Sequence, residues 1–297
     1  MFQTPNLLYM KNETKKLLPK NFPKRLLEIP DYPKQLYIRG ELPLEEYKYL
    51  CVVGARKYSN YGKQTVEKLI SELRGYPIVI VSGLALGIDS IAHRSALETG
   101  LKTVAVPGSG LDPKVLYPAS HRQLAEKIVL SGGMLLSEFE PDFQATSWSF
   151  PQRNRIMAGL SDAVLIVEAE LKSGTLITSK FATEYNRDVL TIPGSIFSKT
   201  SAGPHMLLRL GATPITSSVE LLDALGFDQT ANLKLTTRNY SDCSPDEKKV
   251  IALLSSPASK DELIQNLGLS TSQANILLSM MEIKGLIKES GGEFRLV

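Results

Sequence analysis

The sequence predicts an α/β protein: a doubly wound, mostly parallel sheet of the Rossmann-like kind, followed by a small C-terminal winged-helix domain. Short apolar runs rich in β-branched residues alternate with helical stretches between residues 48 and 226, as they do in βαβ units. Most of these runs end in Gly or Pro-Gly, where a strand must turn into a loop. Beyond residue 244, three helix-start signals precede two short strands, which is the order of elements in a winged helix-turn-helix.

The composition is that of a globular protein. At roughly 150 residues per domain, a chain of 297 residues is expected to form two domains. Hydrophobic residues make up 43% and charged residues 22% of the chain, which argues against a disordered chain, a collagen or a disulfide scaffold. The formal net charge is only +3. Any polyanionic partner must therefore be held by locally arranged groups, because the attraction of the whole molecule is weak.

The cysteines and the apolar segments predict a cytoplasmic protein. Cys51 and Cys243 lie far apart and belong to no C-x-x-C pattern, as expected for reduced thiols without structural zinc. The first twenty residues lack the apolar run of a signal peptide, and no later segment reaches the roughly 18 apolar residues of a membrane span. We expect no contact with a membrane.

Residues 1–47 are expected to form a reduced N-terminal extension. The segment is rich in lysine and proline, and prolines interrupt long helices. We predict extended packing over the neighbouring domain, without an independent core.

Six apolar runs define the expected sheet domain, residues 48–226. Each run is too short and too apolar for an amphipathic surface element, so buried parallel strands are predicted. The runs lie at 49–55, 77–83, 102–108, 134–139, 162–169 and 188–194. In a doubly wound sheet, ligands bind beyond the carboxyl ends of the strands. We therefore expect the functional site at that edge.

A polar linker, residues 227–243, is predicted to separate this sheet from a winged helix-turn-helix domain, residues 244–297. Ser or Thr followed three residues later by Glu or Gln is a capping box that starts a helix. Three such pairs occur in this segment: Ser244 with Glu247, Ser259 with Glu262, and Ser270 with Gln273. A Gly-Gly pair at 291–292 then predicts the turn of a β-hairpin.

The charges of the winged helix argue against binding to duplex DNA. Residues 244–297 contain six basic and seven acidic side chains, and Lys284 is the single cation of the expected recognition helix, 272–284. Proteins that bind DNA grooves use Lys and Arg on phosphates and base edges. We favour a protein-interaction or spacer role for this domain, and a transcription regulator is the weaker alternative.

Glycine-bearing loops and cations follow several of the predicted strands. Glycine lets backbone amides approach an anion closely, and the helix that follows adds its positive dipole. Each loop alone could be a tight turn without a ligand, and each cation alone a solvated surface charge. Together at one sheet edge they suit a phosphate backbone. The candidates are Gly54, Arg56, Ser82, Gly83, Ser109, Arg153, Lys172, Ser173, Gly174, Thr175 and Lys199.

Three aromatic residues stand just before or at the start of the 150–155 segment that contains Arg153. Phe143, Trp148 and Phe150 could stack on the bases of a single strand, as aromatics do in sequence-tolerant binders. Packing in the core is the alternative for each of them, particularly for Phe150 beside Pro151.

Catalytic patterns are sparse. His93, His121 and His205 have no metal-like spacing, and Ser109 lies outside any G-x-S-x-G elbow. Asp89 is expected to cap a helix or to lie in its first turn, with a ribose contact as the alternative. The residues themselves thus predict a phosphate-binding site without a nucleophile, a metal or a cofactor.

Many ordered motifs resemble those of the DNA processing protein A (DprA, also called Smf) family, a Rossmann-like family of bacterial recombination and natural transformation. The winged helix is similar to the one that many members have. The resembling segments are 31–33, 36–40, 53–56, 59–62, 82–89, 92–93, 106–112, 117–118, 137–138, 150–156, 158–161, 173–175, 189–195 and 201–203.

The resemblance implies a protein that is not an enzyme, binds single-stranded DNA, forms a homodimer through its Rossmann domain, and interacts with RecA to help load it onto incoming strands. By position, Arg56 and Lys172 would hold phosphates, and Arg153, Asn154 and Lys199 would line the site. The sequence departs from the family in its short N-terminal segment and in His205, which stands where the family commonly has Asn.

The alternative function is a nucleotide-binding, phosphoribohydrolase-like enzyme. Those Rossmann-like enzymes have a Pro-Gly-Gly-x-Gly-Thr-x-x-Glu run, whose glutamate acts at the ribosyl bond. In the corresponding run here, residues 172–178, Thr178 stands where that acid would be.

Overall fold

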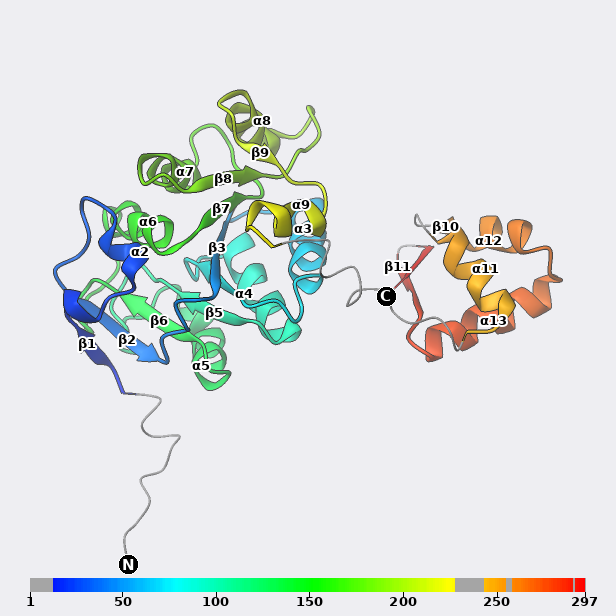
Figure 1. The fold of residues 1–297 in the computed structure, drawn as a ribbon, viewed down its shortest axis with the longest axis horizontal. Helices are drawn as coiled ribbons and strands as arrows, with labels where there is room; N and C mark the ends of the chain where they lie inside the picture. The colour runs from blue at the N-terminus through cyan, green and yellow to red at the C-terminus, as the bar shows by residue number, and fades with distance from the viewer. Residues whose placement is uncertain (1–12, 228–242, 255–257, 291, 297) are drawn as a thin grey trace, which may run out of the picture. The chain divides into compact units, whose positions relative to one another are not determined.

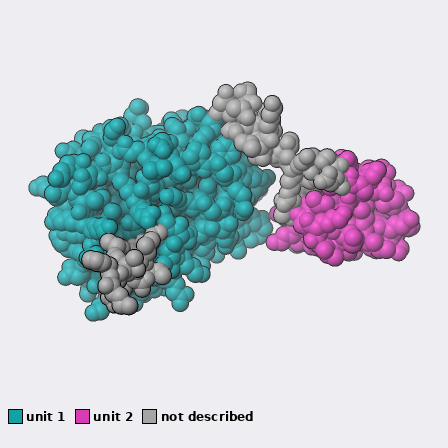
Figure 2. All heavy atoms as spheres, turned by 60° about the horizontal axis from the view of Figure 1, so that its bottom comes forward, with its two compact units in different colours: residues 1–229 teal, residues 230–297 magenta. Residues whose placement is uncertain are grey.

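The computed structural model describes residues 13–227, 243–254, 258–290 and 292–296. The chain divides into two compact units, residues 1–229 and 230–297 (Figure 2). Most of the predicted linker, 228–242, lies outside the described residues, as does Gly291 of the predicted hairpin turn. Each unit is described by itself.

A nine-stranded sheet in the order β1-β2-β6-β5-β4-β3-β7-β8-β9 forms the centre of the described part of the first unit (Figure 1). All six predicted strands are confirmed. They are β3 (Lys48–Val53), β4 (Ile78–Ser82), β5 (Lys102–Ala105), β6 (Met134–Ser137), β7 (Ala163–Ile166) and β8 (Asp188–Thr191), and neighbours among them pair in parallel. The strand order reverses direction between β3 and β7, which is the topological switch point of a doubly wound sheet.

Helices pack on both faces of the sheet, as side-chain alternation along β3 requires. Tyr49, Cys51 and Val53 pack into a core with helices α2 (Lys24–Leu27), α6 (Ser149–Leu160), α7 (Thr175–Glu184) and α8 (Ala202–Arg209). Leu50 and Val52 pack into the opposite core with α3 (Asn60–Ser71), α4 (Ile88–Thr99) and α9 (Ser218–Ala224). Successive residues of a strand point to opposite faces, so one strand supplies both cores. Helix α5 (Arg122–Leu130) covers a third cluster of buried residues.

The segment before residue 48 differs from the prediction. Its described part contributes two strands, β1 (Lys15–Leu17) and β2 (Leu36–Gly40), to the sheet, and β2 pairs antiparallel with β6. Leu36 and Ile38 enter the main core. The prolines lie outside these strands, so they bound the extended segments and do not exclude them from the sheet. Strand β9 (Thr213–Pro214), at the other edge, was also not predicted.

The second unit has the predicted winged-helix elements. Helices α11 (Pro245–Leu253), α12 (Lys260–Leu267) and α13 (Thr271–Ile283) each begin with the reciprocal capping box expected from the sequence. Strands β10 (Ala258–Ser259), β12 (Glu293–Leu296) and β11 (Ile287–Ser290) form a small antiparallel sheet, with β11 and β12 as the hairpin. Ala274, Leu278 and Met281 of α13 face the core of this unit.

Two properties of the described residues bear on function. None of their helices is long and apolar enough to cross a membrane. Nowhere among them do three or more histidine, cysteine or acidic side chains gather as metal ligands would.

Candidate functional site

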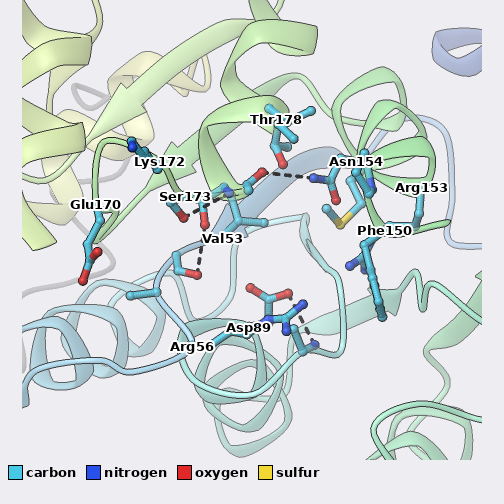
Figure 3. A pocket seen from close by; sticks show the side chains of 18 of the residues that line it. Val53, Arg56, Asp89, Phe150, Arg153, Asn154, Glu170, Lys172, Ser173 and Thr178 are labelled. Carbon is cyan, nitrogen blue, oxygen red and sulfur yellow. Dashed lines mark hydrogen bonds between the residues drawn. The ribbon is translucent and has the colours of Figure 1, made fainter. Parts of the chain in front are cut away.

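A cavity of about 460 Å³ lies at the switch point of the sheet, and we call it the switch-point cavity (Figure 3). Three segments supply most of its walls: the β3–α3 loop, the first turns of α6, and the β7–α7 loop. Most of the expected residues meet there, namely Gly54, Arg56, Phe150, Arg153, Asn154, Lys172, Ser173, Gly174 and Thr175. The structure therefore brings together segments that lie up to about 120 residues apart, because the parallel strands end at one edge.

Arg56 stands over an aromatic ring at this cavity. Its guanidinium carbon lies 5.4 Å from the centroid of the Phe150 ring, within the range of a cation–π contact. The side chain is exposed, and among the described residues no carboxylate or carbonyl holds its guanidinium. An exposed guanidinium is free to grip a phosphate with two parallel hydrogen bonds. Figure 3 shows the Phe150 ring beside the cavity, so phosphate and base binding are both available here.

Two lysines add positive charge to the lining. Lys172, in the β7–α7 loop, was expected from the sequence, whereas Lys57 was not. Both are exposed. Lys57 could have been recognised as the residue that follows Arg56 after the same strand. Two acidic residues, Asp89 and Glu170, also line the cavity. The four lysines and arginines of the lining outnumber them.

The start of α7 supplies backbone donors. Gly174 is the N-cap residue of this helix, and the Ser173 hydroxyl accepts a hydrogen bond from the Thr175 amide at 3.2 Å. The Thr175 hydroxyl donates to the Gly54 carbonyl oxygen at 3.2 Å, which joins the β7–α7 loop to the end of β3. The Asn154 amide donates to the Gly174 carbonyl oxygen at 3.3 Å. The helix N-terminus is thus held at the cavity, where its dipole favours an anion.

Arg153 is buried, in contrast to Arg56. Its guanidinium donates to the carbonyl oxygens of Gly83, at 2.6 Å, and of Val106. Asp89 accepts from the Gly83 and Ala85 amides at 3.1 and 3.4 Å. Burial lowers the pKa of Arg153 to about 10 and raises the pKa of Asp89. Arg153 still carries its charge at neutral pH, but its donors are directed at the β4 and β5 loops, so it positions these loops beneath the cavity.

Four other candidates lie outside the switch-point cavity, namely Ser82, Gly83, Ser109 and Lys199. The Ser82 hydroxyl is fully buried and donates to the Val52 carbonyl oxygen at 2.6 Å. The Ser109 hydroxyl is also fully buried, donating to the Gly110 carbonyl oxygen and accepting from the Tyr117 amide. Lys199 is exposed on the short 3-10 helix 199–201 and does not line the cavity, although its neighbour Thr200 does. The hydroxyls of Ser82 and Ser109 are committed to backbone groups, and Gly83 and Lys199 do not line the cavity, so we do not include these four residues in the proposed site.

The aromatic residues divide into two groups. Phe150 lines the cavity and contacts Tyr117 at a centroid distance of 5.6 Å. Phe143 and Trp148 instead pack on Phe139, at centroid distances of 4.5 and 5.6 Å. The structure thus favours Phe150 as the residue that could stack on a base. For Phe143 it favours packing at the edge of the core.

The histidines are held by hydrogen bonds within the fold. His93 Nδ1 lies 2.7 Å from the Thr103 hydroxyl, and burial lowers the pKa of His93 to about 3. His121 Nδ1 lies 2.8 Å from the Leu84 carbonyl oxygen, and His205 Nε2 lies 3.0 Å from that of Gly194. A neutral, packed His93 is poorly suited to act as a general base near neutral pH.

Sequence comparison identifies two family models along the chain. The model of DNA recombination-mediator protein A matches residues 15–226, and that of the DprA winged helix domain matches residues 235–293. The DNA processing protein DprA of Streptococcus pneumoniae is 44% identical over 206 residues, which are 69% of this chain and 72% of that protein. The protein Smf of Escherichia coli is 39% identical over 225 residues, covering 75% of this chain but only 60% of the length of that protein.

Two solved structures of DNA processing protein A resemble this chain. One is DNA processing protein A of Streptococcus pneumoniae, with a TM-score of 0.66 and 40% identity, covering 73% of this chain and 76% of that one. The other is DNA processing protein A of Helicobacter pylori, described for its single-stranded DNA binding mode. It has a TM-score of 0.65 and 32% identity, and covers 72% of this chain and 96% of that one.

Proposed function

The chain belongs to the DNA recombination-mediator protein A family, and on that premise we propose that it binds single-stranded DNA in the switch-point cavity. We further propose that it acts as a recombination mediator and helps to load RecA onto incoming strands during natural transformation. We propose no catalytic activity, a homodimeric state and a cytoplasmic location. RecA contact, dimerisation and transformation rest on the family resemblance.

One observation supports DNA binding most directly. An exposed Arg56 stands over Phe150, within a cavity that also has Lys57, Lys172 and the N-terminus of α7. Cations and backbone amides hold phosphates without reading sequence, and an aromatic face stacks on any base. This combination suits a single strand, whose bases are free to stack, better than a duplex.

The proposed function can be tested by fluorescence anisotropy with a labelled oligothymidine and the matching duplex. The proteins are the wild type, the double variant Arg56→Ala with Lys172→Ala, and a chain ending at Asp242, which lacks the winged helix. We expect a preference for the single strand that survives the truncation and is lost in the double variant. Lys68→Ala is the matched control, because Lys68 is an exposed cation on α3 outside the cavity.

Other outcomes would redirect the assignment. A duplex preference that disappears on truncation would move DNA binding to the winged helix. Absence of binding to either DNA would favour the nucleotide-enzyme alternative, which release of free base from a nucleoside monophosphate would then test. If single-strand binding is observed, the rate of RecA filament formation on DNA coated with a single-strand-binding protein tests the mediator role.

A further inference from the structure

A second cavity, of about 550 Å³, lies at the same edge of the sheet. We call it the serine cavity, because four of its lining residues are serines. It is lined by Ser59, Tyr61, Glu168, Pro193, Gly194, Ser195, Ser198 and Ser201. Its volume is within the range of small-molecule sites, and the proposed contacts to the DNA backbone do not use it.

The two cavities are built on the same loops. The β3–α3 segment lines the first cavity with Arg56 and Lys57 and the second with Ser59 and Tyr61. The segment after β7 likewise contributes Glu170 to the first cavity and Glu168 to the second. Thr200 lines the first, and its neighbour Ser201 lines the second. A chain molecule held by its phosphates in the switch-point cavity therefore has a neighbouring group within reach of the serine cavity.

The chemistry of the serine cavity differs from that of its neighbour. Its lining contains hydroxyls and one carboxylate but no lysine or arginine. Glu168 is only 4% exposed. Its carboxylate accepts hydrogen bonds from the Ser59 amide at 2.9 Å, the Ser59 hydroxyl at 2.5 Å and the Thr200 hydroxyl at 3.1 Å. These bonds fix an acceptor in the cavity wall, which disfavours a phosphate and favours a neutral group with N–H donors.

Apolar side chains stand beside this cavity. Between its lining residues Ser195 and Ser198, Ile196 is 80% exposed and Phe197 is 92% exposed. Two adjacent large apolar side chains that are exposed to water contribute no hydrophobic stabilisation to the isolated protein. An exposed aromatic ring next to a polar cavity is suited to stack on a base.

We propose that the serine cavity receives a nucleobase of the bound single strand and favours bases with an exocyclic amino group. The Glu168 carboxylate would accept from that amino group, as Glu and Asp accept from cytosine N4. Thymine has a carbonyl oxygen at the same ring position, whose lone pairs would face the carboxylate. The inference rests on the proposed function, since the base can enter the serine cavity only when the phosphates are held in the adjacent switch-point cavity.

The proposal is tested by comparing the affinities for two bases whose rings have the same size, cytosine and thymine. Anisotropy gives the dissociation constants of oligodeoxycytidine and oligothymidine of equal length for the full chain. We expect the wild type to bind oligodeoxycytidine about fivefold more tightly or better, the lower end of discrimination by a well-placed base contact. Glu168→Gln, which replaces one acceptor oxygen by a donor, should bring the ratio close to one. Phe197→Ala should weaken both oligonucleotides and leave their ratio unchanged.

A second variant covers the case in which Glu168→Gln fails to fold. Ser195→Trp fills the cavity from its exposed rim and leaves the bonds of Glu168 in place, so it too should abolish the preference. Ser71→Trp, at an exposed serine of α3 outside both cavities, controls for an added aromatic ring. The proposal is overturned if the wild type shows no preference for cytosine, or if the preference survives Ser195→Trp. If the wild type binds neither oligonucleotide, it is the proposed function that fails.

Discussion

Arg153 holds Gly83 through a hydrogen bond of 2.6 Å from its guanidinium to the glycine carbonyl oxygen. A Cβ atom added at Gly83 would overlap this guanidinium and would lie 2.6 Å from a carboxylate oxygen of Asp89. Glycine is thus required at the end of β4 by the close approach of a buried cation. The two arginines look alike in the sequence but differ in the structure: Arg153 is buried and holds the loops, whereas Arg56 is exposed at the switch-point cavity.

Replacing Arg153 should therefore affect stability first. Arg153→Ala leaves the buried carbonyl oxygens of Gly83 and Val106 without this donor, and a buried polar group left without its partner costs about 1 to 3 kcal/mol. Urea denaturation should show a loss of this order in the free energy of unfolding. Arg56→Ala, at an exposed position, is the control and should change stability by less than about 0.5 kcal/mol. Unchanged stability with lost DNA binding would instead make Arg153 a DNA contact.

The salt dependence of binding should count the phosphate contacts. For single strands, the slope of log affinity against log salt is about −0.7 per neutralised phosphate. Arg56→Gln and Lys57→Gln should each reduce the magnitude of the slope by about 0.7. Titrations at four salt concentrations measure it, and Lys68→Gln should leave it unchanged. An unaltered slope for Lys57→Gln would mean that this lysine lines the cavity without touching the backbone of the strand.

Phe150 should contribute through its aromatic face. Phe150→Leu keeps an apolar side chain beside Tyr117 but removes the ring that Arg56 overlies and on which a base could stack. A stacked base is worth about 1 to 3 kcal/mol, so affinity should fall about fivefold or more. Phe143→Leu, which changes a ring outside the cavity, is the comparison by anisotropy. Equal effects of the two substitutions would assign both rings to packing.

The winged-helix unit should lose stability in acid through Glu247. The Lys284 ammonium donates to the Glu247 carboxylate at 2.7 Å, and this bond, together with the Ser244 amide, holds the pKa of Glu247 below its usual value. A folded-state pKa below the unfolded value of about 4.3 means that the contribution is present above that pH and is lost as the pH falls below it. Urea denaturation, followed through NMR signals of α11 and α13 at pH 6 and 3.5, measures the loss. It should be smaller in Glu247→Gln, whose side chain does not titrate.

The exposed face of α13 should bind duplex DNA poorly. Ile276, Met280 and Ile283 are 63%, 48% and 82% exposed, and Lys284 is engaged with Glu247. Phosphate contacts require cations on this face. Lysine at all three apolar positions should create duplex binding that weakens with salt, and glutamine at the same positions should not. Strong duplex binding by the wild-type chain that survives truncation at Asp242 would place that activity outside the winged helix.

Local sequence patterns were sufficient to predict those elements in which all the side chains have the same kind of surroundings. The six central strands are continuous apolar runs because both faces of the sheet are covered, and the capping boxes of the winged helix are formed by residues three apart. Strand β2 was missed because the segment before residue 48 was interpreted from its prolines and lysines, and the strand itself contains the charged residue Arg39. In the fold this residue is 3% exposed and pairs with Glu126 at 2.7 Å.

The sequence by itself determined the α/β class, the winged helix, and the sheet edge at which Arg56, Phe150 and Lys172 would be found, because hydrophobic periodicity and capping depend on residues close together in the chain. Only the tertiary structure decided which candidates share a cavity. It buried Arg153 and Ser82 with hydrogen bonds to backbone groups of other segments, buried Ser109 with bonds inside its own loop, and formed the serine cavity around Glu168. These outcomes depend on contacts between residues up to about 110 positions apart, which no local pattern of the sequence specifies.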